Sequence, residues 1–280
     1  MHGDALAWRV HGAGPTMFIY NGLLSTDLHW RYWIPHYRDR YAVLSWDYPG
    51  HGASPRPRDL SAVGIRAFAD AGHRVLAASG APRPAIVCGL SMGVQSALEH
   101  YRDHPGDVRA LVLICGTFGH PLARLSSSER ARRLLTASLR AAGRAGRLLR
   151  GALWPLAGTP LGRELAYLTG GAHRELCPQE VLDELFAHLA RLDSDVIAAA
   201  VTSYLDHTAE DVLDTIAVPT LIIAGDRDQL TPASIAERMH RRVAGSSLHV
   251  IRGHTHLAQV ECPDAIHEVV DRFLDERGLR

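Results

Sequence analysis

A serine between two glycines is the first candidate for chemistry in this sequence. An apolar run that begins at Ala85 stops at Gly89, Ser91 and Gly93 follow, and helix-forming residues come next. This G-x-S-x-G layout is typical of a nucleophile elbow, a strained strand-to-helix turn that presents a serine hydroxyl in a cleft. Glycines are needed there because the backbones of strand and helix come so close that side chains at 89 and 93 would collide. The pattern predicts that Ser91 is a nucleophile.

A serine hydroxyl needs a base that removes its proton, and the sequence offers candidates further along the chain. Histidine suits this role because its pKa lies near neutral pH, and a carboxylate is needed to orient the ring. Asp226 and Asp228 follow one apolar run, and His254 and His256 lie in the loop after the next. The order Ser, Asp, His is the one used on sheets that carry such an elbow. These residues by themselves leave both aspartates and both histidines open.

Alternating strands and helices must position these residues. Short apolar runs with β-branched and aromatic residues are separated by segments in which apolar residues recur at helical spacing, as in residues 61–79. Such alternation predicts βαβ crossovers and a parallel sheet, in which ligands collect at the carboxyl ends of the strands. Asn21, Asp47, Ser91 and Gly116 all fall at such ends. The predicted strands are 6–10, 16–20, 41–46, 85–89, 110–115, 218–224 and 247–251.

The strand rhythm is interrupted by residues 118–210, which contain helix signals only. We predict that this segment is a helical cap over the carboxyl edge of the sheet, and that residues 1–117 and 211–280 form the core. The clearest helices of the segment open at Pro178 and after Ser194. The side chains expected to face inward from these two helices are Leu182, Leu185, Phe186, Leu189 and Leu192, and then Ile197, Val201 and Tyr204.

The composition is that of one large α/β domain or of a domain with an insertion. The chain has 280 residues, of which 46% are hydrophobic, enough for a sizeable core. Its formal net charge is zero, so no global field attracts nucleic acid or an acidic partner. All 30 basic residues are arginines, which excludes a Schiff-base lysine and the lysine of a phosphate-binding P-loop.

Cysteine use and the start of the chain bear on location and cofactors. The four cysteines are widely spaced without a paired motif, which favours free thiols over disulfides. The N-terminal residues lack the regions of a signal peptide, and no apolar run reaches membrane-spanning length, so we expect a soluble cytoplasmic protein. No cysteine pair has metal-ligand spacing and no Gly-x-Gly-x-x-Gly follows a strand, so the sequence predicts neither a metal site nor a dinucleotide cofactor.

The motifs together resemble those of the α/β-hydrolase superfamily over essentially the full length of the chain. Residues 21–23 (Asn-Gly-Leu) stand where the family usually has His-Gly, and residues 47–54 match its D-x-x-G-x-G-x-S turn. The elbow at Ser91, a G-x-x-D after a late strand and a histidine near the end complete the match in the right order. The resemblance implies a mostly parallel central sheet flanked by helices, with an inserted helical cap.

The resemblance also chooses between the paired candidates. Family members of this type keep the catalytic aspartate three positions after the glycine that ends the strand, which selects Asp228 and leaves Asp226 as a loop residue. In similar proteins the histidine precedes a Glu-x-Pro sequence by a fixed interval, which selects His256. His254 is then an ordinary loop histidine, and His51 is interpreted as a structural residue of the 47–54 turn.

The family also uses two backbone amides to hold the negative oxygen of a tetrahedral intermediate. The resemblance assigns these amides to Met92, directly after the nucleophile, and to Leu23, with Leu24 as the less favoured choice. Asn21, which replaces the family's histidine, is expected to brace this loop through its side-chain amide.

The leading hypothesis is therefore a serine hydrolase that cleaves an ester, lactone or thioester of a small-molecule substrate with an apolar group, through an acyl-enzyme and without a cofactor. Serine at position 91 excludes epoxide hydrolases and haloalkane dehalogenases, which place aspartate there. Carbon–carbon bond hydrolases, cofactor-free perhydrolases, acyltransferases and non-catalytic ligand-binding members remain as alternatives. The arginine-rich segment 124–150 is interpreted as the solvated face of a cap helix, with anionic substrates or an acidic membrane surface as the other readings.

Overall fold

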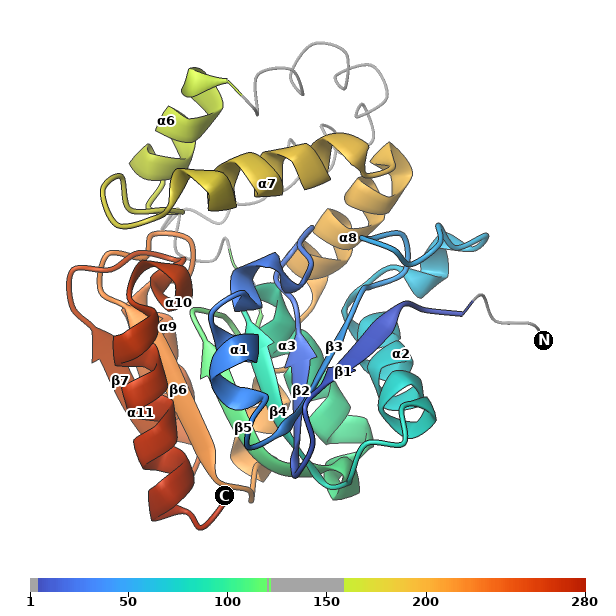
Figure 1. Ribbon diagram of the computed structural model, residues 1–280, viewed down its shortest axis with the longest axis vertical. Helices are drawn as coiled ribbons and strands as arrows, with labels where there is room; N and C mark the ends of the chain where they lie inside the picture. Colours follow the sequence, from blue (N-terminus) through green and yellow to red (C-terminus); the bar gives the residue numbers. More distant parts are fainter. Residues whose placement is uncertain (1–4, 120, 122–158) are drawn as a thin grey trace.

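The computed structural model describes residues 5–119, 121 and 159–280. In this part of the chain, seven strands form one sheet in the order β1-β3-β2-β4-β5-β6-β7 (Figure 1). β1 runs antiparallel to β3, and the neighbouring pairs from β3 to β7 are parallel. The predicted mostly parallel α/β fold is therefore confirmed. The strands are β1 (Trp8–His11), β2 (Thr16–Tyr20), β3 (Ala42–Trp46), β4 (Ala85–Leu90), β5 (Val108–Ile114), β6 (Thr220–Gly225) and β7 (Ser247–Ile251).

Helices cover both faces of the sheet because its central strands are apolar on both sides. Phe18 and Tyr20 of β2 point to one face and pack in a cluster with residues of α2, α3 and α9. Met17 and Ile19 alternate with them and pack on the other face with α1 and α11. The helices are α1 (Trp33–Tyr37), α2 (Ile65–Ala78), α3 (Met92–Asp103), α6 (Pro160–Leu168), α7 (Gln179–Arg191), α8 (Ser194–Asp206), α9 (Ala233–Arg242), α10 (Ala258–Glu261) and α11 (Pro263–Glu276).

Helices α6, α7 and α8 lie between β5 and β6 in the sequence and sit over the carboxyl edge of the sheet (Figure 1). The buried side chains Val181 and Leu182 of α7 pack against Leu257 and Val260, which belong to the segment that follows β7. The arginine-rich segment 124–150 lies outside the described residues.

Helix α8 differs from the prediction in the face that it buries. Val196 and Ala200 are buried, whereas Ile197 and Val201 are only half-buried. The reason is a close approach to the turn after β3, where a Cβ atom on Gly50 would lie 2.9 Å from a methyl group of Val196. The buried residues thus lie one position earlier than predicted at Val196 and Ala200, whereas Tyr204, also predicted to face inward, packs against the core as expected.

The four cysteines, Cys88, Cys115, Cys177 and Cys262, are free thiols, as the sequence predicted. Among the helices that the structure describes, none combines the length and the apolar character needed to cross a bilayer.

Candidate active site

The turn between β4 and α3 has the strained geometry of a nucleophile elbow. Ser91 adopts φ 55° and ψ −117°, a backbone conformation that residues other than glycine rarely adopt. A Cβ atom on Gly89 would lie 2.6 Å from the carbonyl oxygen of Gly93. A Cβ atom on Gly93 would lie 2.7 Å from the carbonyl oxygen of Asn21 and closer still to that of Tyr20. Both glycines are thus required by close backbone approaches, one within the elbow and one to the end of β2.

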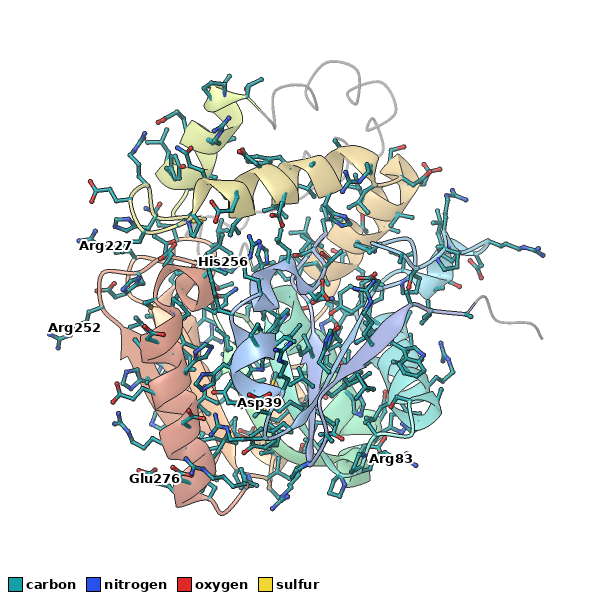
Figure 2. All side chains as sticks on the ribbon, in the orientation of Figure 1. Asp39, Arg83, Arg227, Arg252, His256 and Glu276 are labelled. Carbon is teal, nitrogen blue, oxygen red and sulfur yellow. The ribbon has the colours of Figure 1, made fainter. Side chains whose placement is uncertain are left out.

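The structure brings Ser91, His256 and Asp228 into one hydrogen-bonded chain. The Nε2 atom of His256 lies 2.9 Å from Ser91 Oγ, and its Nδ1 atom lies 2.8 Å from Asp228 Oδ2. Asp228 and His256 are buried, with 3% and 8% of their surfaces exposed. Figure 2 shows His256 between the sheet and α7. With Nδ1 protonated toward the carboxylate, Nε2 is an acceptor for the serine proton, which is the arrangement that general-base activation of a hydroxyl requires.

Backbone and hydroxyl donors hold the Asp228 carboxylate in place. Its Oδ1 accepts hydrogen bonds from the backbone N–H groups of Leu230 and Thr231, each at 2.8 Å. Its Oδ2 accepts from the Thr231 hydroxyl at 2.7 Å, and that hydroxyl lies 3.2 Å from His256 Nδ1. Burial works to raise the pKa of Asp228, but His256 and these hydrogen bonds outweigh it and hold the pKa below its ordinary value. No motif in the sequence points to the part played by Thr231.

The same pairing acts on His256 in the opposite sense. Burial works to lower the pKa of the imidazole, but the charge of Asp228 and its hydrogen bond raise it above the ordinary value of 6.5. The loop that carries His256 is fixed by Glu261, whose carboxylate accepts hydrogen bonds from the backbone N–H groups of Thr255 at 2.9 Å and His173 at 2.8 Å. The Thr255 hydroxyl also donates to Glu261.

The alternative aspartate, Asp226, and the alternative histidine, His254, are not part of the hydrogen-bonded series Asp228–His256–Ser91. Asp226 Oδ1 accepts a hydrogen bond from the backbone N–H of Gly253 at 2.7 Å, so this aspartate ties together the loops after β6 and β7. The Nδ1 atom of His254 lies 3.4 Å from Glu261 Oε2. Both side chains occupy the loop positions that the sequence suggested for them.

The loop after β2 lies directly against the nucleophile. A Cβ atom on Gly22 would lie 3.6 Å from Ser91 Cβ, and Leu23 lines the cavity above the serine. Asn21 donates from Nδ2 to the carbonyl oxygen of Trp46 at 2.8 Å and accepts at Oδ1 from Trp30 Nε1 at 3.1 Å. This side chain joins the loop to β3 and to the segment before α1, as expected for a brace.

An apolar cavity of about 410 Å³ opens above Ser91 and His256. Its walls come from the loop after β2, from β4, from helices α7 and α8 and from the loop after β6. A cavity of this size suits a small or medium ligand with an apolar group. The apolar side chains that line it include Leu23, Leu90, Leu182, Leu185, Phe186, Tyr204, Leu205, Leu230 and Leu257.

Two further histidines near this region differ in their placement. His29, which the sequence did not single out, lines the cavity, and its Nδ1 lies 3.2 Å from the Ser25 hydroxyl. Burial, together with the nearby His256, lowers the pKa of His29 to about 4, so its ring is neutral at physiological pH. His51 is buried with Nδ1 3.1 Å from the Pro49 carbonyl oxygen, and burial lowers its pKa to about 4. His51 is thus a packed residue of the turn after β3.

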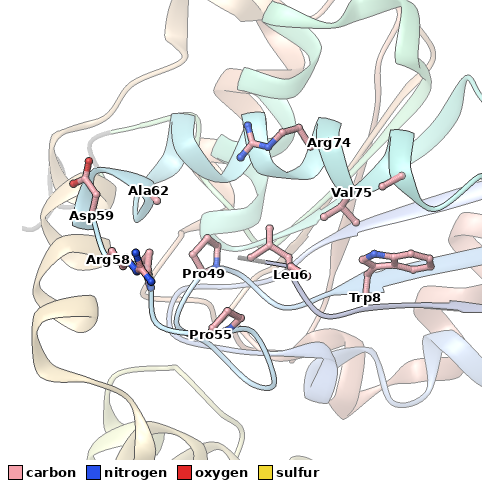
Figure 3. Close-up of a pocket in the computed structure, with 12 residues that line it drawn as sticks. Leu6, Trp8, Pro49, Pro55, Arg58, Asp59, Ala62, Arg74 and Val75 are labelled. Atoms are coloured by element: carbon pink, nitrogen blue, oxygen red, sulfur yellow. The ribbon is translucent and has the colours of Figure 1, made fainter. Parts of the chain in front are cut away.

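A second and larger cavity, of about 810 Å³, lies at the β1 edge of the sheet (Figure 3). It is bounded by Leu6 and Trp8, by the loop that contains Pro49 and Arg58, and by Val75 of α2. Ser91 and His256 line the apolar cavity described above and not this one, so we take the apolar cavity as the candidate active site.

Fold and site together place the chain in a known class. Residues 10–269 match the sequence model of the alpha/beta hydrolase family, and the chain belongs to this family. It is 27% identical over 280 residues to a pimeloyl-[acyl-carrier protein] methyl ester esterase of Neisseria meningitidis, covering 97% of this chain and 93% of that protein. It is 25% identical over 268 residues to 3-oxoadipate enol-lactonase 2 of Acinetobacter baylyi, covering 91% and 87%. These relatives support a hydrolase.

Solved structures show the same fold. A bromoperoxidase from Bacillus anthracis matches with a TM-score of 0.80 at 18% identity, covering 98% of this chain and all of that one (100%). An esterase from Exiguobacterium antarcticum matches with a TM-score of 0.78, also at 18% identity, covering 96% and 95%. At these identities the likeness concerns the fold alone.

Proposed function

We propose that the protein is a serine hydrolase that cleaves a carboxylic ester, lactone or thioester of a small to medium apolar substrate. The observation that carries this proposal is the continuous hydrogen-bonded chain from Asp228 through His256 to Ser91, which ends in an apolar cavity of about 410 Å³. The esterase and lactonase relatives support cleavage of an ester or a lactone.

The reaction begins with attack of Ser91 Oγ on the substrate carbonyl while His256 Nε2 takes the serine proton. Asp228 keeps the ring in the required tautomer and stabilises the imidazolium that forms. The backbone amides of Met92 and Leu23 donate to the tetrahedral oxygen, His256 returns the proton to the leaving alcohol or thiol, and an acyl-enzyme on Ser91 remains. A water molecule then attacks the acyl carbonyl while His256 takes its proton, and His256 returns this proton to Ser91 Oγ as the bond to the acid product breaks.

The cavity walls set the substrate class in this proposal. Residues 118–210 act as a cap on the core formed by 1–117 and 211–280, and the described cap helices supply Leu182, Phe186 and Tyr204 to the wall above Ser91. These side chains favour an apolar acyl or alcohol group, because such a group gains free energy by leaving water for an apolar cavity.

A panel of chromogenic substrates tests the proposed function. Wild type is assayed with p-nitrophenyl acetate, butyrate, octanoate and laurate and with a series of lactones of increasing ring size. We expect turnover with a preference for short or medium acyl chains, loss of this turnover in Ser91→Ala, and retention in Ser79→Ala, a control at the end of α2. Absence of turnover across the panel would contradict the proposal and favour a ligand-binding role. Equal turnover by Ser91→Ala would also contradict it, because hydrolysis would then not depend on Ser91.

A further inference from the structure

Three side chains of metal-ligating type meet near the amino end of strand β5. This is the end of the sheet opposite to the one that carries Ser91. His73 comes from α2, His100 from α3, and Asp107 directly precedes β5. Their ligating atoms all lie within 4.8 Å of one another. His73 Nδ1 lies 2.7 Å from Asp107 Oδ2, and His100 Nε2 lies 3.7 Å from the same oxygen. In Figure 2, Arg83, a neighbour of this cluster, lies at the far end of the sheet from His256.

The buried member of the cluster is incompletely satisfied. His100 is fully buried, with 0% of its surface exposed, and its Nε2 atom has no hydrogen-bond partner among the described residues. The 3.7 Å between this nitrogen and Asp107 Oδ2 is too long for a hydrogen bond. A buried polar atom without a partner costs free energy, and a native structure that keeps one calls for an explanation. A cation between His100 Nε2 and the Asp107 carboxylate would satisfy both groups.

The second ring nitrogen of His100, Nδ1, has the kind of hydrogen bond that is found in metal-bound imidazoles. The Tyr20 hydroxyl lies 2.6 Å from His100 Nδ1 and 3.3 Å from the carbonyl oxygen of Ala69, to which it can donate. When it does so, Nδ1–H donates to the tyrosine oxygen, and Nε2 keeps its lone pair for a ligand. Metal-ligating histidines commonly make such a bond through their second nitrogen, because it fixes the tautomer and the orientation of the ring.

We propose that His73 Nδ1, His100 Nε2 and Asp107 Oδ2 bind a divalent transition metal ion, Zn²⁺ by preference, with solvent as the fourth ligand. Two imidazoles and one carboxylate suit zinc, and a tetrahedral site places its donor atoms about 3.3 Å apart. The distances of 2.7 and 3.7 Å bracket this value. The His73 side chain is 32% exposed, so it offers the ion an entry path from solvent.

Neighbouring groups are compatible with this role. Arg83 contacts the other oxygen of Asp107, Oδ1, at 3.3 Å, which leaves Oδ2 available to the metal. The ring of His104 stacks on that of His73 with centroids 3.6 Å apart and planes at 7°, which holds the His73 ring in position. The metal would join α2, α3 and the start of β5, and so would stabilise the fold on the side away from the candidate active site. Spacing along the chain predicted no metal site because the ligands come from three separate elements.

Metal binding by the full chain tests this proposal. Chelator-treated, dialysed protein is titrated with Zn²⁺ by calorimetry, and the bound metal is counted by elemental mass spectrometry. We expect one Zn²⁺ per chain and a rise in Tm of about 5 °C at a hundredfold excess over Kd. With Co²⁺ in place of zinc, the visible absorption bands of a tetrahedral N/O site are expected.

Two variants of the accessible ligands and one matched control locate the ion. His73→Ala and Asp107→Asn should each weaken Zn²⁺ binding by about a hundredfold or more and remove the Tm increase. His36→Ala removes a similar half-exposed histidine, which lies 2.9 Å from Asp271 elsewhere on the surface, and should bind like wild type. Absence of stoichiometric binding by wild type would overturn the proposal, as would unchanged affinity in both ligand variants.

Discussion

The Nε2 atom of His256 lies 2.9 Å from the Oγ atom of Ser91, although 165 residues separate the two in the chain. Ser91 is fixed by the strained turn after β4, and His256 by the loop after β7, which Glu261 braces. Two independently fixed elements thus place a base and a hydroxyl at hydrogen-bond distance. Such preorganisation lowers the cost of reaching a reactive geometry.

The choice between the two late histidines leads to a first prediction. His256→Ala should lower kcat/KM by roughly 10⁴-fold or more, because it removes the base that activates Ser91. His254→Ala should stay within about tenfold of wild type, since this side chain only approaches Glu261 at 3.4 Å. Steady-state kinetics on one ester compares the two variants. A mild His256→Ala and an inactive His254→Ala would reverse the assignment.

The aspartates give a parallel comparison. Asp228→Asn should lower kcat/KM by about 10⁴-fold, because an amide at this position favours the wrong tautomer of His256. Asp226→Asn keeps an oxygen that can accept the hydrogen bond from Gly253, so its kcat/KM should stay within about twofold of wild type. Comparable losses in the two variants would argue against Asp228 as the orienting residue.

The pH dependence follows from the raised pKa of His256. The base must be neutral, so kcat/KM should increase about tenfold per pH unit at low pH and level off above the pKa. That midpoint should lie above 6.5, and it should fall in Asp228→Asn because the charge and hydrogen bond that raise the pKa are removed. A pH series with both proteins measures the two midpoints. A flat wild-type profile between about pH 5 and pH 8 would be incompatible with a histidine base.

The elbow glycine also leads to a stability prediction. Gly93→Ala forces a Cβ atom to 2.7 Å from the Asn21 carbonyl oxygen, so the free energy of unfolding should fall by about 1–3 kcal/mol. Gly106→Ala is the control, because a Cβ atom there would meet nothing within 4 Å, and its stability should stay within about 0.5 kcal/mol of wild type. Denaturant unfolding of both variants gives the comparison, and equal stabilities would show that the elbow tolerates a side chain.

The strands and the elbow could be predicted because their signals are local. A continuous apolar run that stops at a glycine identifies β4, and the turn at Ser91 follows directly from the G-x-S-x-G spacing. The resemblance to a known family then selected Asp228 over Asp226 and His256 over His254, a choice that the residue types and their order left open. The positions of strands depend mainly on residues that are neighbours along the chain, so they can be predicted directly from the sequence.

Other features depend on contacts between distant segments and leave no local signal. Thr231 bonds to Asp228 and His29 lines the cavity, yet each stands in a loop or short turn without a motif. The one-residue shift in the buried face of α8 depends on the approach of Val196 to Gly50, which periodicity within the helix does not report. The His100–Asp107 cluster is likewise formed by tertiary packing alone.

Covalent labelling with a fluorophosphonate, followed by peptide mapping, tests directly whether Ser91 is an activated nucleophile. We expect one adduct per chain, located on Ser91, whose formation slows strongly in His256→Ala and disappears in Ser91→Ala. A protein that stays unlabelled across the pH range in which His256 is neutral, or that carries the adduct on another residue, would contradict this expectation.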